Sequence, residues 1–220
     1  MYHMNDYDKM KTGELFNQTD RSLLFKMART YWLVRRLNRT SLLNQPKRNR
    51  LLKRILGRID GKSYYVQSPL HIDYGFNTFV GKNFLSNYNL TIMDEGEVHI
   101  GDDVMIAPNV TITTDLHPLV AAERKVCWVP NWFPHNHKGN YVHAKPITIG
   151  DRVWICAGVT ICPGVTIGND SVIGAGSVVT KDIPPGVLAY GVPCKVIRPI
   201  TDADKVIQNQ SRSKKYEEKF

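Results

Sequence analysis

The chain has 220 residues, of which 42% are hydrophobic and 22% charged, and its formal net charge is +9. This length and composition allow one domain with a sizeable core and exclude a disordered chain. No apolar run approaches the ~20 residues of a membrane-spanning helix, and the polar start lacks the hydrophobic stretch of a signal peptide, so we expect a cytoplasmic protein.

The cysteines and the basic residues narrow the class of protein further. No C-x-x-C pair occurs, so we expect free thiols at Cys127, Cys156, Cys162 and Cys194. Basic residues gather between Arg35 and Arg58 and again near the C-terminus. Such a balance fits a nucleic acid, an acidic membrane surface or a polyanionic small molecule as partner. For the first cluster, a solvated helix face is the simpler explanation.

Residues 12–59 show helical periodicity. The spacing predicts an amphipathic helix, capped at its start by Thr19 or Asp20, whose buried stripe is Leu24, Met27, Tyr31 and Val34. Pro46 can open a second helix. The buried face expected for that helix is Leu51, Leu52, Ile55 and Ile59.

From Val80 onward, apolar residues recur every six positions. The clearest run begins at Ile149 and reads IGDRVW, ICAGVT, ICPGVT, IGNDSV, IGAGSV and VTKDIP. Shorter runs begin at Val80, Ile92 and Ile100. This period is neither helical nor a two-residue alternation, and it is typical of a parallel β-helix in which each hexapeptide makes one short strand and one turn.

A coil of three faces needs three hexapeptides, about eighteen residues. The sequence therefore predicts that Ile149 stacks on Ile167, Ile155 on Ile173 and Ile161 on Val179. The residue four positions after each of these would be a second, smaller inward position. Gly and Asn-Asp pairs would occupy the corners, where turns favour them.

Residues 118–145 break the period and are rich in aromatic residues: Trp128, Trp132, Phe133 and Tyr141. We expect an ordered loop inserted in the β-helix, because insertions of this length are usually functional or disordered and aromatic residues argue against disorder. The expected organisation is a helical region at 1–66, a β-helix at 67–200 and a polar tail at 201–220.

Several motifs resemble those of the maltose and galactoside O-acetyltransferases. GELF, IDYGFN, NLTIMDEG, IGDDVMIAPNVTI, the His-Pro pair, PGVTIGNDSVIGAGSVVTKDIP and GVPCKVIR follow in that family's order, from Lys11 to about Asp204. The resemblance implies a left-handed parallel β-helix, a homotrimer with active sites between subunits, and transfer of acetyl from acetyl-CoA to a sugar hydroxyl. It implies no nucleic acid partner and no membrane span.

The resemblance also implies roles for individual residues. His117, in the His-Pro pair, matches the general base, a role that suits a side chain with a pKa near neutrality. Ala157 matches the backbone N–H that stabilises the oxyanion. Acceptor contacts are implied for Asn87, Glu95 and Asp73. Acetyl-CoA contacts are implied for Trp154, Ala157, Ala175, Thr180, Lys181, Lys195 and Arg198.

Three departures from the family pattern concern the acceptor. Glu95 stands where the galactoside enzymes carry a shorter acid, Leu85 stands where they carry an aromatic residue, and the insertion is about a dozen residues longer. Loop variation on a rigid scaffold commonly changes specificity. The aromatic residues of the insertion could roof the acceptor site or brace a neighbouring subunit, and the sequence does not separate these two interpretations.

Other functions on the same scaffold compete with this one. The acceptor could be a non-sugar molecule or a polysaccharide, or the chain could be a non-catalytic scaffold. A zinc-dependent, carbonic-anhydrase-like trimer would use three histidines, and the chain offers His117, His135, His137 and His143. Three of these lie in the irregular insertion and the CoA motifs would then be unexplained, so we expect no metal.

Overall fold

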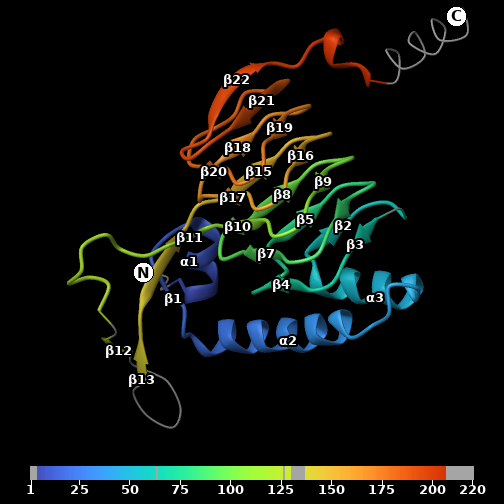
Figure 1. Ribbon diagram of the computed structural model, residues 1–220. Coiled ribbons are helices and arrows are strands. Elements are labelled where there is room, and N and C mark those ends of the chain that lie inside the picture. The colour runs from blue at the N-terminus through green and yellow to red at the C-terminus, as the bar shows by residue number, and fades with distance from the viewer. Residues whose placement is uncertain (1–3, 63, 126, 130–136, 207–220) are drawn as a thin grey trace, which may run out of the picture.

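A computed structural model describes residues 4–62, 64–125, 127–129 and 137–206. Its body is a parallel β-solenoid whose three faces are parallel sheets, with helices lying across the end where the solenoid begins (Figure 1). No helix among the described residues is long and apolar enough to cross a membrane.

Successive coils contribute parallel strands to the three sheets, and sheet 3 is extended at its far end by an antiparallel strand. Sheet 1 contains β2 (Arg58–Ile59), β5 (Thr78–Val80), β8 (Val98–Ile100), β15 (Ile147–Ile149) and β18 (Thr166–Ile167). Sheet 2 contains β4 (Leu70–Ile72), β7 (Leu90–Met93), β10 (Thr111–Thr113), β17 (Thr160–Ile161) and β20 (Val178–Val179). Sheet 3 contains β3 (Tyr65–Val66), β6 (Leu85–Ser86), β9 (Met105–Ile106), β16 (Trp154–Ile155), β19 (Val172–Ile173), β21 (Val187–Tyr190) and β22 (Lys195–Pro199).

The register predicted from the six-residue period is confirmed. Ile149 pairs with Ile167, Ile155 with Ile173 and Ile161 with Val179, in parallel ladders. These side chains are buried, and so are the smaller residues of the second inward position: Val153, Val159, Val165, Ser171 and Ser177. Because one coil leaves its apolar side chains uncovered above and below, each coil stabilises the next.

The corners use residues that tolerate the left-handed backbone region. Asn89, Asn109, Gly158 and Gly176 occupy the same corner in four coils, with φ values of 58°, 61°, 70° and 69°. Glycine reaches this region without steric cost, and Asn reaches it more easily than other residues. Asn83, Asp103 and Asp170 take the same conformation at a second corner, where Arg152, with φ of 56°, is an exception to the composition expected from the sequence.

The N-terminal region contains α1 (Asp6–Thr12), β1 (Phe16–Asn17), α2 (Arg21–Asn38) and α3 (Gln45–Ile55). Asp20 caps α2 by accepting a hydrogen bond from the Ser22 N–H at 2.9 Å. Of the predicted stripe of α2, Val34 is buried as expected, Leu24 and Met27 are half-buried, and Tyr31 is 57% exposed. The buried residues of α2 are Leu23, Thr30, Leu33, Val34 and Leu37.

Helix α3 begins near Pro46 as expected and buries Leu51, Leu52 and Ile55, whereas Ile59 lies beyond it in β2. It also buries Arg48, which sequence reasoning had assigned to a solvated face. The Arg48 guanidinium donates to the carbonyl oxygens of Leu37, Thr40 and Val66 at 3.0, 2.7 and 2.6 Å. Arg48 therefore joins α2, α3 and the first coil.

The solenoid begins earlier than expected and pairs back on itself at its far end. The first strand, β2, lies before residue 67 and pairs in parallel with β5. At the other end, β21 and β22 are antiparallel. A short 3-10 helix, η1 (Asp202–Asp204), follows.

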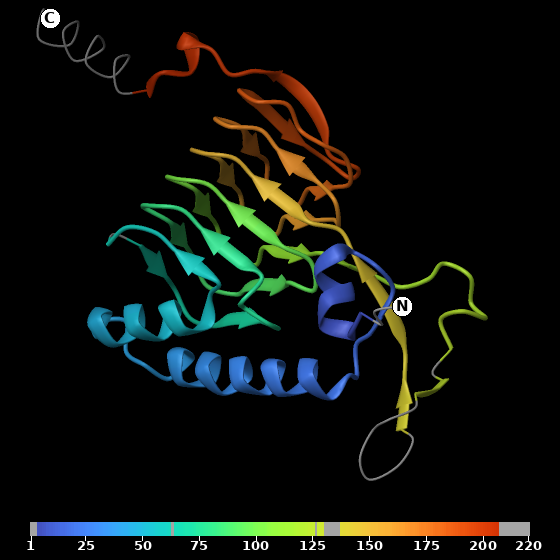
Figure 2. The ribbon, with the colours of Figure 1, turned by 180° about the vertical axis from the view of Figure 1, so that it is seen from behind.

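The insertion leaves the solenoid after β10 and returns before β15. It contains β11 (Asp115–Leu116), β12 (Cys127–Val129), β13 (His137–Gly139) and β14 (Tyr141–Ala144). Strand β14 pairs with β11 and with β1, so it ties the insertion to the N-terminal region (Figure 2). Trp132, Phe133 and His135 lie outside the described residues.

Candidate active site

Several of the site residues predicted from the sequence follow strands of sheet 2 or of sheet 3. They therefore lie on two different edges of the solenoid. Asp73, Glu95 and Asp115 follow β4, β7 and β10, whose residues are stacked in register. We call this edge the acidic corner. Asn87, Ala157 and Ala175 follow β6, β16 and β19 of sheet 3, also stacked in register, and we call that edge the small-residue corner.

Glu95 is the central group of the acidic corner. Its side chain is 1% exposed, its Oε1 accepts a hydrogen bond from Gln18 Nε2 at 3.2 Å, and its Oε2 has no partner among the described residues. Burial, and next the negative charge of Asp115, raise the pKa of Glu95 to about 8. At neutral pH this carboxyl is therefore mostly protonated and can donate as well as accept a hydrogen bond.

Two further carboxyl groups share this environment. Asp94 is fully buried and accepts hydrogen bonds from the Tyr74 N–H and the Thr78 hydroxyl at 2.8 and 2.9 Å. Burial raises the pKa of Asp94 to about 7 despite these bonds. Burial, and next the charge of Asp115, also raise the pKa of Asp73. The acidic corner is thus a cluster of carboxyl groups that are largely buried and have raised pKa values, an environment typical of functional sites.

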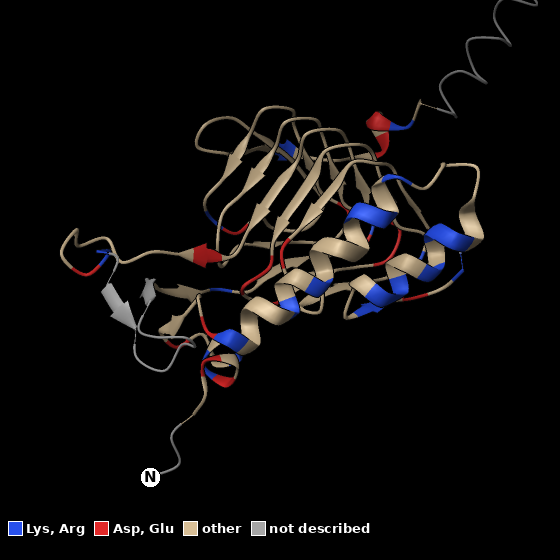
Figure 3. Cartoon of the chain, turned by 90° about the horizontal axis from the view of Figure 1, so that it is seen from below, with Lys and Arg blue, Asp and Glu red and all other residues tan. Residues whose placement is uncertain are grey.

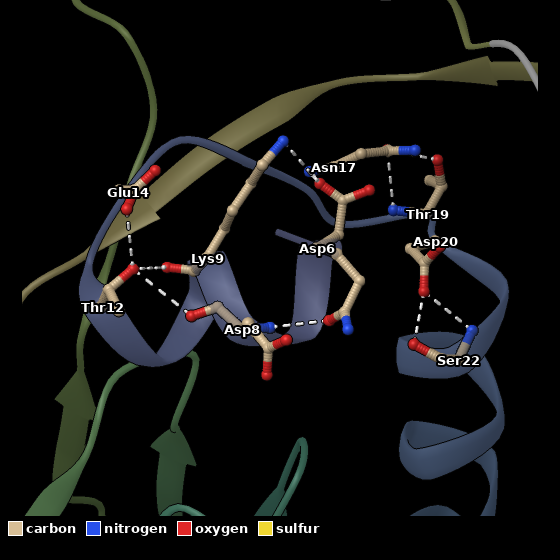
Figure 4. A network of polar contacts seen from close by, with 10 residues as sticks. Asp6, Asp8, Lys9, Thr12, Glu14, Asn17, Thr19, Asp20 and Ser22 are labelled. Carbon is tan, nitrogen blue, oxygen red and sulfur yellow. Dashed lines mark hydrogen bonds and ion pairs between the residues drawn. The ribbon is translucent and has the colours of Figure 1, made fainter. Parts of the chain in front are cut away.

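Gln18 is a site residue that sequence reasoning missed. The residues on either side of it are fixed, because the Asn17 N–H donates to Asp6 at 3.0 Å and Thr19 bonds the Asn17 side chain (Figure 4). Gln18 stands 77 positions from Glu95 in the chain. The GELF motif close before it was the only signal, and it did not point to this residue.

His117 lies just beyond the acidic corner and is exposed. The backbone of His117 is not part of a coil. The coil ends at Thr114, whose N–H donates to the Met93 carbonyl, and Asp115 and Leu116 already pair with β14 in the antiparallel direction. The β11–β14 ladder therefore fixes the backbone next to His117.

Asn140 connects His117 with Gln18. Its side-chain Nδ2 lies 3.4 Å from His117 Nδ1, and its carbonyl oxygen accepts a hydrogen bond from the Gln18 N–H at 3.4 Å. The structure thereby places His117, Gln18 and Glu95 around one end of sheet 2. Sequence reasoning gave no role to Asn140.

The small-residue corner offers an unused donor. The Ala157 N–H donates no hydrogen bond within the described residues, whereas the neighbouring Cys156 and Gly158 N–H groups donate to the Ile173 and Pro108 carbonyls. Ala157 and Ala175 are exposed and lie on successive coils, since the Gly176 N–H donates to the Ala157 carbonyl at 2.9 Å. Asn87 is half-buried and its side chain donates to Gln67 at 3.3 Å.

The other residues expected to contact acetyl-CoA are divided between the edges. Thr180 and Lys181 follow β20 and so continue the line of the acidic corner, while Trp154 is half exposed on sheet 3. Lys195 and Arg198 lie on β22, where Arg198 donates to both carboxylate oxygens of Asp204 at 2.8 and 2.7 Å. Neither Lys181 nor Lys195 forms an ion pair with a described residue.

A single chain does not bring His117 and Ala157 together. The two corners are opposite edges of sheet 2, and the four residues of β7 set them roughly 10 Å or more apart at ~3.3 Å per residue. One chain alone therefore does not place the two corners around one reacting group.

Comparison with known proteins decides the family. Residues 9–61 match the maltose acetyltransferase hexapeptide capping motif, and residues 146–181 match the bacterial transferase hexapeptide repeats. The chain is 43% identical to galactoside O-acetyltransferase of Escherichia coli (strain K12) over 90% of its own length and 91% of the relative's. The chain belongs to the maltose and galactoside acetyltransferase family.

Solved structures of this acetyltransferase family agree with the fold. A maltose O-acetyltransferase from Clostridium difficile 630 superimposes with a TM-score of 0.81 at 40% identity, over 90% of this chain and 99% of that one. A galactoside acetyltransferase in complex with coenzyme A superimposes with a TM-score of 0.82 at 42% identity, over 92% and 94% of the two chains.

Within the described part of this acetyltransferase, no group of three or more His, Cys, Asp or Glu side chains is arranged to hold a metal ion. Of the four histidines considered as zinc ligands, His135 lies outside the described residues. Cys156, Cys162 and Cys194 are free, and burial raises the pKa of each of these thiols, which disfavours the reactive thiolate form.

Proposed function

We propose that this enzyme transfers an acetyl group from acetyl-CoA to a hydroxyl group of a sugar or glycoside. The observation that carries the proposal is the position of His117 beside Asn140, Gln18 and the buried Glu95 at one end of sheet 2. The family relationship supports the same chemistry, since the relatives named above act on galactosides or maltose by their names and one holds coenzyme A.

His117 acts as general base in this proposal. A ring nitrogen of His117 accepts the hydroxyl proton as the acceptor oxygen attacks the thioester carbonyl, which forms the C–O bond. The tetrahedral intermediate then expels CoA as its C–S bond breaks, and the protonated imidazole returns the proton to the leaving thiolate. No covalent acyl-enzyme is needed, because direct transfer requires positioning and one base.

Asn140 is a positioning residue for that step. An amide side chain presents either an oxygen or an NH₂ group to a neighbour. When its Oδ1 accepts the proton on Nδ1 of His117, the imidazole is held in the tautomer whose Nε2 is free to accept the hydroxyl proton. The 3.4 Å separation of the two groups is suited to a bond that tightens when substrate is bound.

Glu95 and Gln18 recognise the acceptor together, with Asp73 beside them. Gln18 Nε2 donates to Oε1 of Glu95, and Oε2 is buried without a partner among the described residues, so an acceptor hydroxyl reaches this carboxyl by displacing the half-buried Gln18 side chain. A site built to hydrogen-bond a hydroxyl discriminates strongly against analogues that lack it. Asn87 contributes from the small-residue corner.

The complete site forms between neighbouring chains of a homotrimer. The acidic corner of one chain, with His117, faces the small-residue corner of the next. The free Ala157 N–H then stabilises the oxyanion, and the exposed backbone near Ala175 leaves room for the pantetheine arm. Trp154, Thr180, Lys181, Lys195 and Arg198 complete the CoA groove, in which Arg198 shares its guanidinium with Asp204.

An acceptor screen tests the proposed function. The panel contains galactosides, maltose, a polysaccharide, serine and an amino sugar, with acetyl-CoA as donor and release of free CoA thiol as the measurement. We expect acetylation of a sugar hydroxyl and a loss of about 10²- to 10⁴-fold in kcat/KM in His117→Asn. His99→Asn is the matched control, because His99 lies on sheet 1 and stacks on Phe79.

Three outcomes would contradict the proposal. Transfer to an amine only would exclude O-acetylation, and a fully active His117→Asn would exclude the base. Stoichiometric zinc that is lost together with activity would favour the zinc-dependent, carbonic-anhydrase-like alternative.

A further inference from the structure

The basic charge of the molecule is concentrated in the two long N-terminal helices. Residues 21–59 contain no Asp or Glu and hold twelve basic residues: Arg21, Lys26, Arg29, Arg35, Arg36, Arg39, Lys47, Arg48, Arg50, Lys53, Arg54 and Arg58. Figure 3 shows the basic positions along α2 and α3, with acidic residues confined to other segments. This segment alone accounts for more positive charge than the net +9 of the chain.

A groove runs between β4 and helix α2, which belongs to this basic segment. It consists of two adjoining cavities of about 360 and about 450 Å³. Both are lined by Tyr31, Ile72 and Asp73, so they form one continuous groove. Asp73 belongs to the acidic corner, which places one part of the groove next to the proposed acceptor site.

The polarity of the groove changes along its length. The cavity nearer the start of α2 is lined by Leu24, Met27, Ala28 and Tyr31 and is mainly apolar. The cavity nearer the end of α2 is lined by Arg35, Asn38, Arg39 and His71 in addition to apolar residues. From Met27 to Arg35 the helix rises about 12 Å at ~1.5 Å per residue.

The walls of the groove are held at fixed positions. Asn38 donates to the Leu70 carbonyl at 2.8 Å and accepts from the Leu70 N–H at 2.9 Å, which joins the end of α2 to β4. Thr30, which also lies on α2, donates a hydrogen bond from its hydroxyl group to the Tyr74 carbonyl oxygen at 2.6 Å. These bonds keep α2 beside β4, so the groove is present before a ligand binds.

The two arginines in the groove are available to an anion. Neither Arg35 nor Arg39 forms an ion pair within the described ranges of the chain. Arg35 stacks on Trp32, with its guanidinium carbon 5.5 Å from the ring centroid. Stacking restricts this side chain, and a restricted guanidinium loses less entropy when it binds a carboxylate or phosphate.

We infer that this groove binds the distal part of an amphipathic, anionic glycoside, with its sugar hydroxyl at His117 and its anionic group at Arg35 and Arg39. The apolar stretch lined by Met27, Tyr31 and Ile72 covers the spacer between them. This inference rests on the proposed function, because it assumes that the sugar lies at the acidic corner. Three of the four residues predicted as a core stripe, Leu24, Met27 and Tyr31, line this groove, and Met27 packs against the core as well.

A pair of acceptors tests the inference. Octyl β-galactoside and ω-carboxyoctyl β-galactoside differ only in the terminal carboxylate. At low salt we expect the wild-type enzyme to favour the carboxylate by roughly tenfold in kcat/KM, an advantage that 1 M salt reduces. Arg35→Gln/Arg39→Gln should lose the preference while it keeps its activity on the octyl glycoside. Arg36→Gln, exposed on the same helix and outside the groove, should behave as wild type.

The outcomes separate this inference from the proposed function. Equal use of the two galactosides by wild type, or an equal loss on both in the double variant, overturns the groove and leaves the sugar assignment intact. If neither these galactosides nor any other sugar of the acceptor panel is acetylated, the sugar assignment fails. Calorimetry with octanoate then tests the groove: tighter binding to wild type than to the double variant supports it, and equal binding overturns it. A changed oligomeric state in the double variant would assign the groove to subunit contact and overturn the inference.

Discussion

Among single residues, Glu95 shows how burial turns an ordinary acid into a specific binding group. It is surrounded by protein, one oxygen is held by Gln18, and the nearest charges are negative. Its pKa is raised from 4.5 to about 8, so the folded chain keeps a proton that the unfolded chain releases. Stability from this residue is therefore fully present below about pH 4.5 and falls as the pH rises toward 8.

Glu95→Gln should remove that dependence. The amide is neutral at every pH, so the stability of the variant relative to wild type should increase between pH 5 and pH 8, by about 1–3 kcal/mol. Urea unfolding of both proteins across this range measures it, with the exposed Glu123→Gln as control. Parallel pH profiles for Glu95→Gln and wild type would show that Glu95 is ionised throughout. Asp94 contributes with the same sign in both proteins and cancels.

Sequence reasoning identified Glu95 but not its partner. The family motif NLTIMDEG points to Glu95, whereas no local pattern points to Gln18, because the two are brought together only by the docking of the N-terminal segment on the solenoid. The same holds for Asn140, which lies in the irregular insertion. Contacts between segments far apart in the chain are absent from any periodicity.

Among the elements, α3 depends on a buried charge. Arg48→Met should destabilise the enzyme by about 2–4 kcal/mol, because three buried carbonyl oxygens lose their donor. Urea unfolding at a fixed protein concentration measures the loss. Arg50 is exposed on the same helix, and Arg50→Met should lower the free energy of unfolding by less than about 0.5 kcal/mol. Equal effects of the two substitutions would show that Arg48 supports nothing specific.

Helix α2 shows where periodicity stops being informative. Its helical spacing fits two neighbouring stripes that share Val34, one through Leu24 and Tyr31 and one through Leu23 and Leu37, and both are apolar enough to be buried. Which stripe is buried depends on the layer that α2 packs against, and the sequence of α2 alone carries no information about that layer. The solenoid differs, because each coil packs against a copy of its own pattern, and its register was predictable to the residue.

For the whole molecule, the opposite corners of sheet 2 predict complementation between inactive chains. His117→Ala lacks the base, and Ala175→Trp would block the small-residue corner. Neither variant should be active alone. After the two are unfolded and refolded together in equal amounts, a mixed trimer should contain sites with an intact half from each chain, giving about a quarter of wild-type activity by random assembly. No recovery in the mixture would place each site within one chain.

The insertion departs from the solenoid and rejoins it at a single point. The Lys145 N–H donates to the Thr114 carbonyl at 2.9 Å, and Ile112 still pairs with Ile161 as if nothing intervened. The coil therefore places no requirement on the length of what lies between these two residues. The part of the insertion between β11 and β14 can therefore change in length and sequence, and so alter the substrate, while the coil and the β11–β14 ladder beside His117 stay the same.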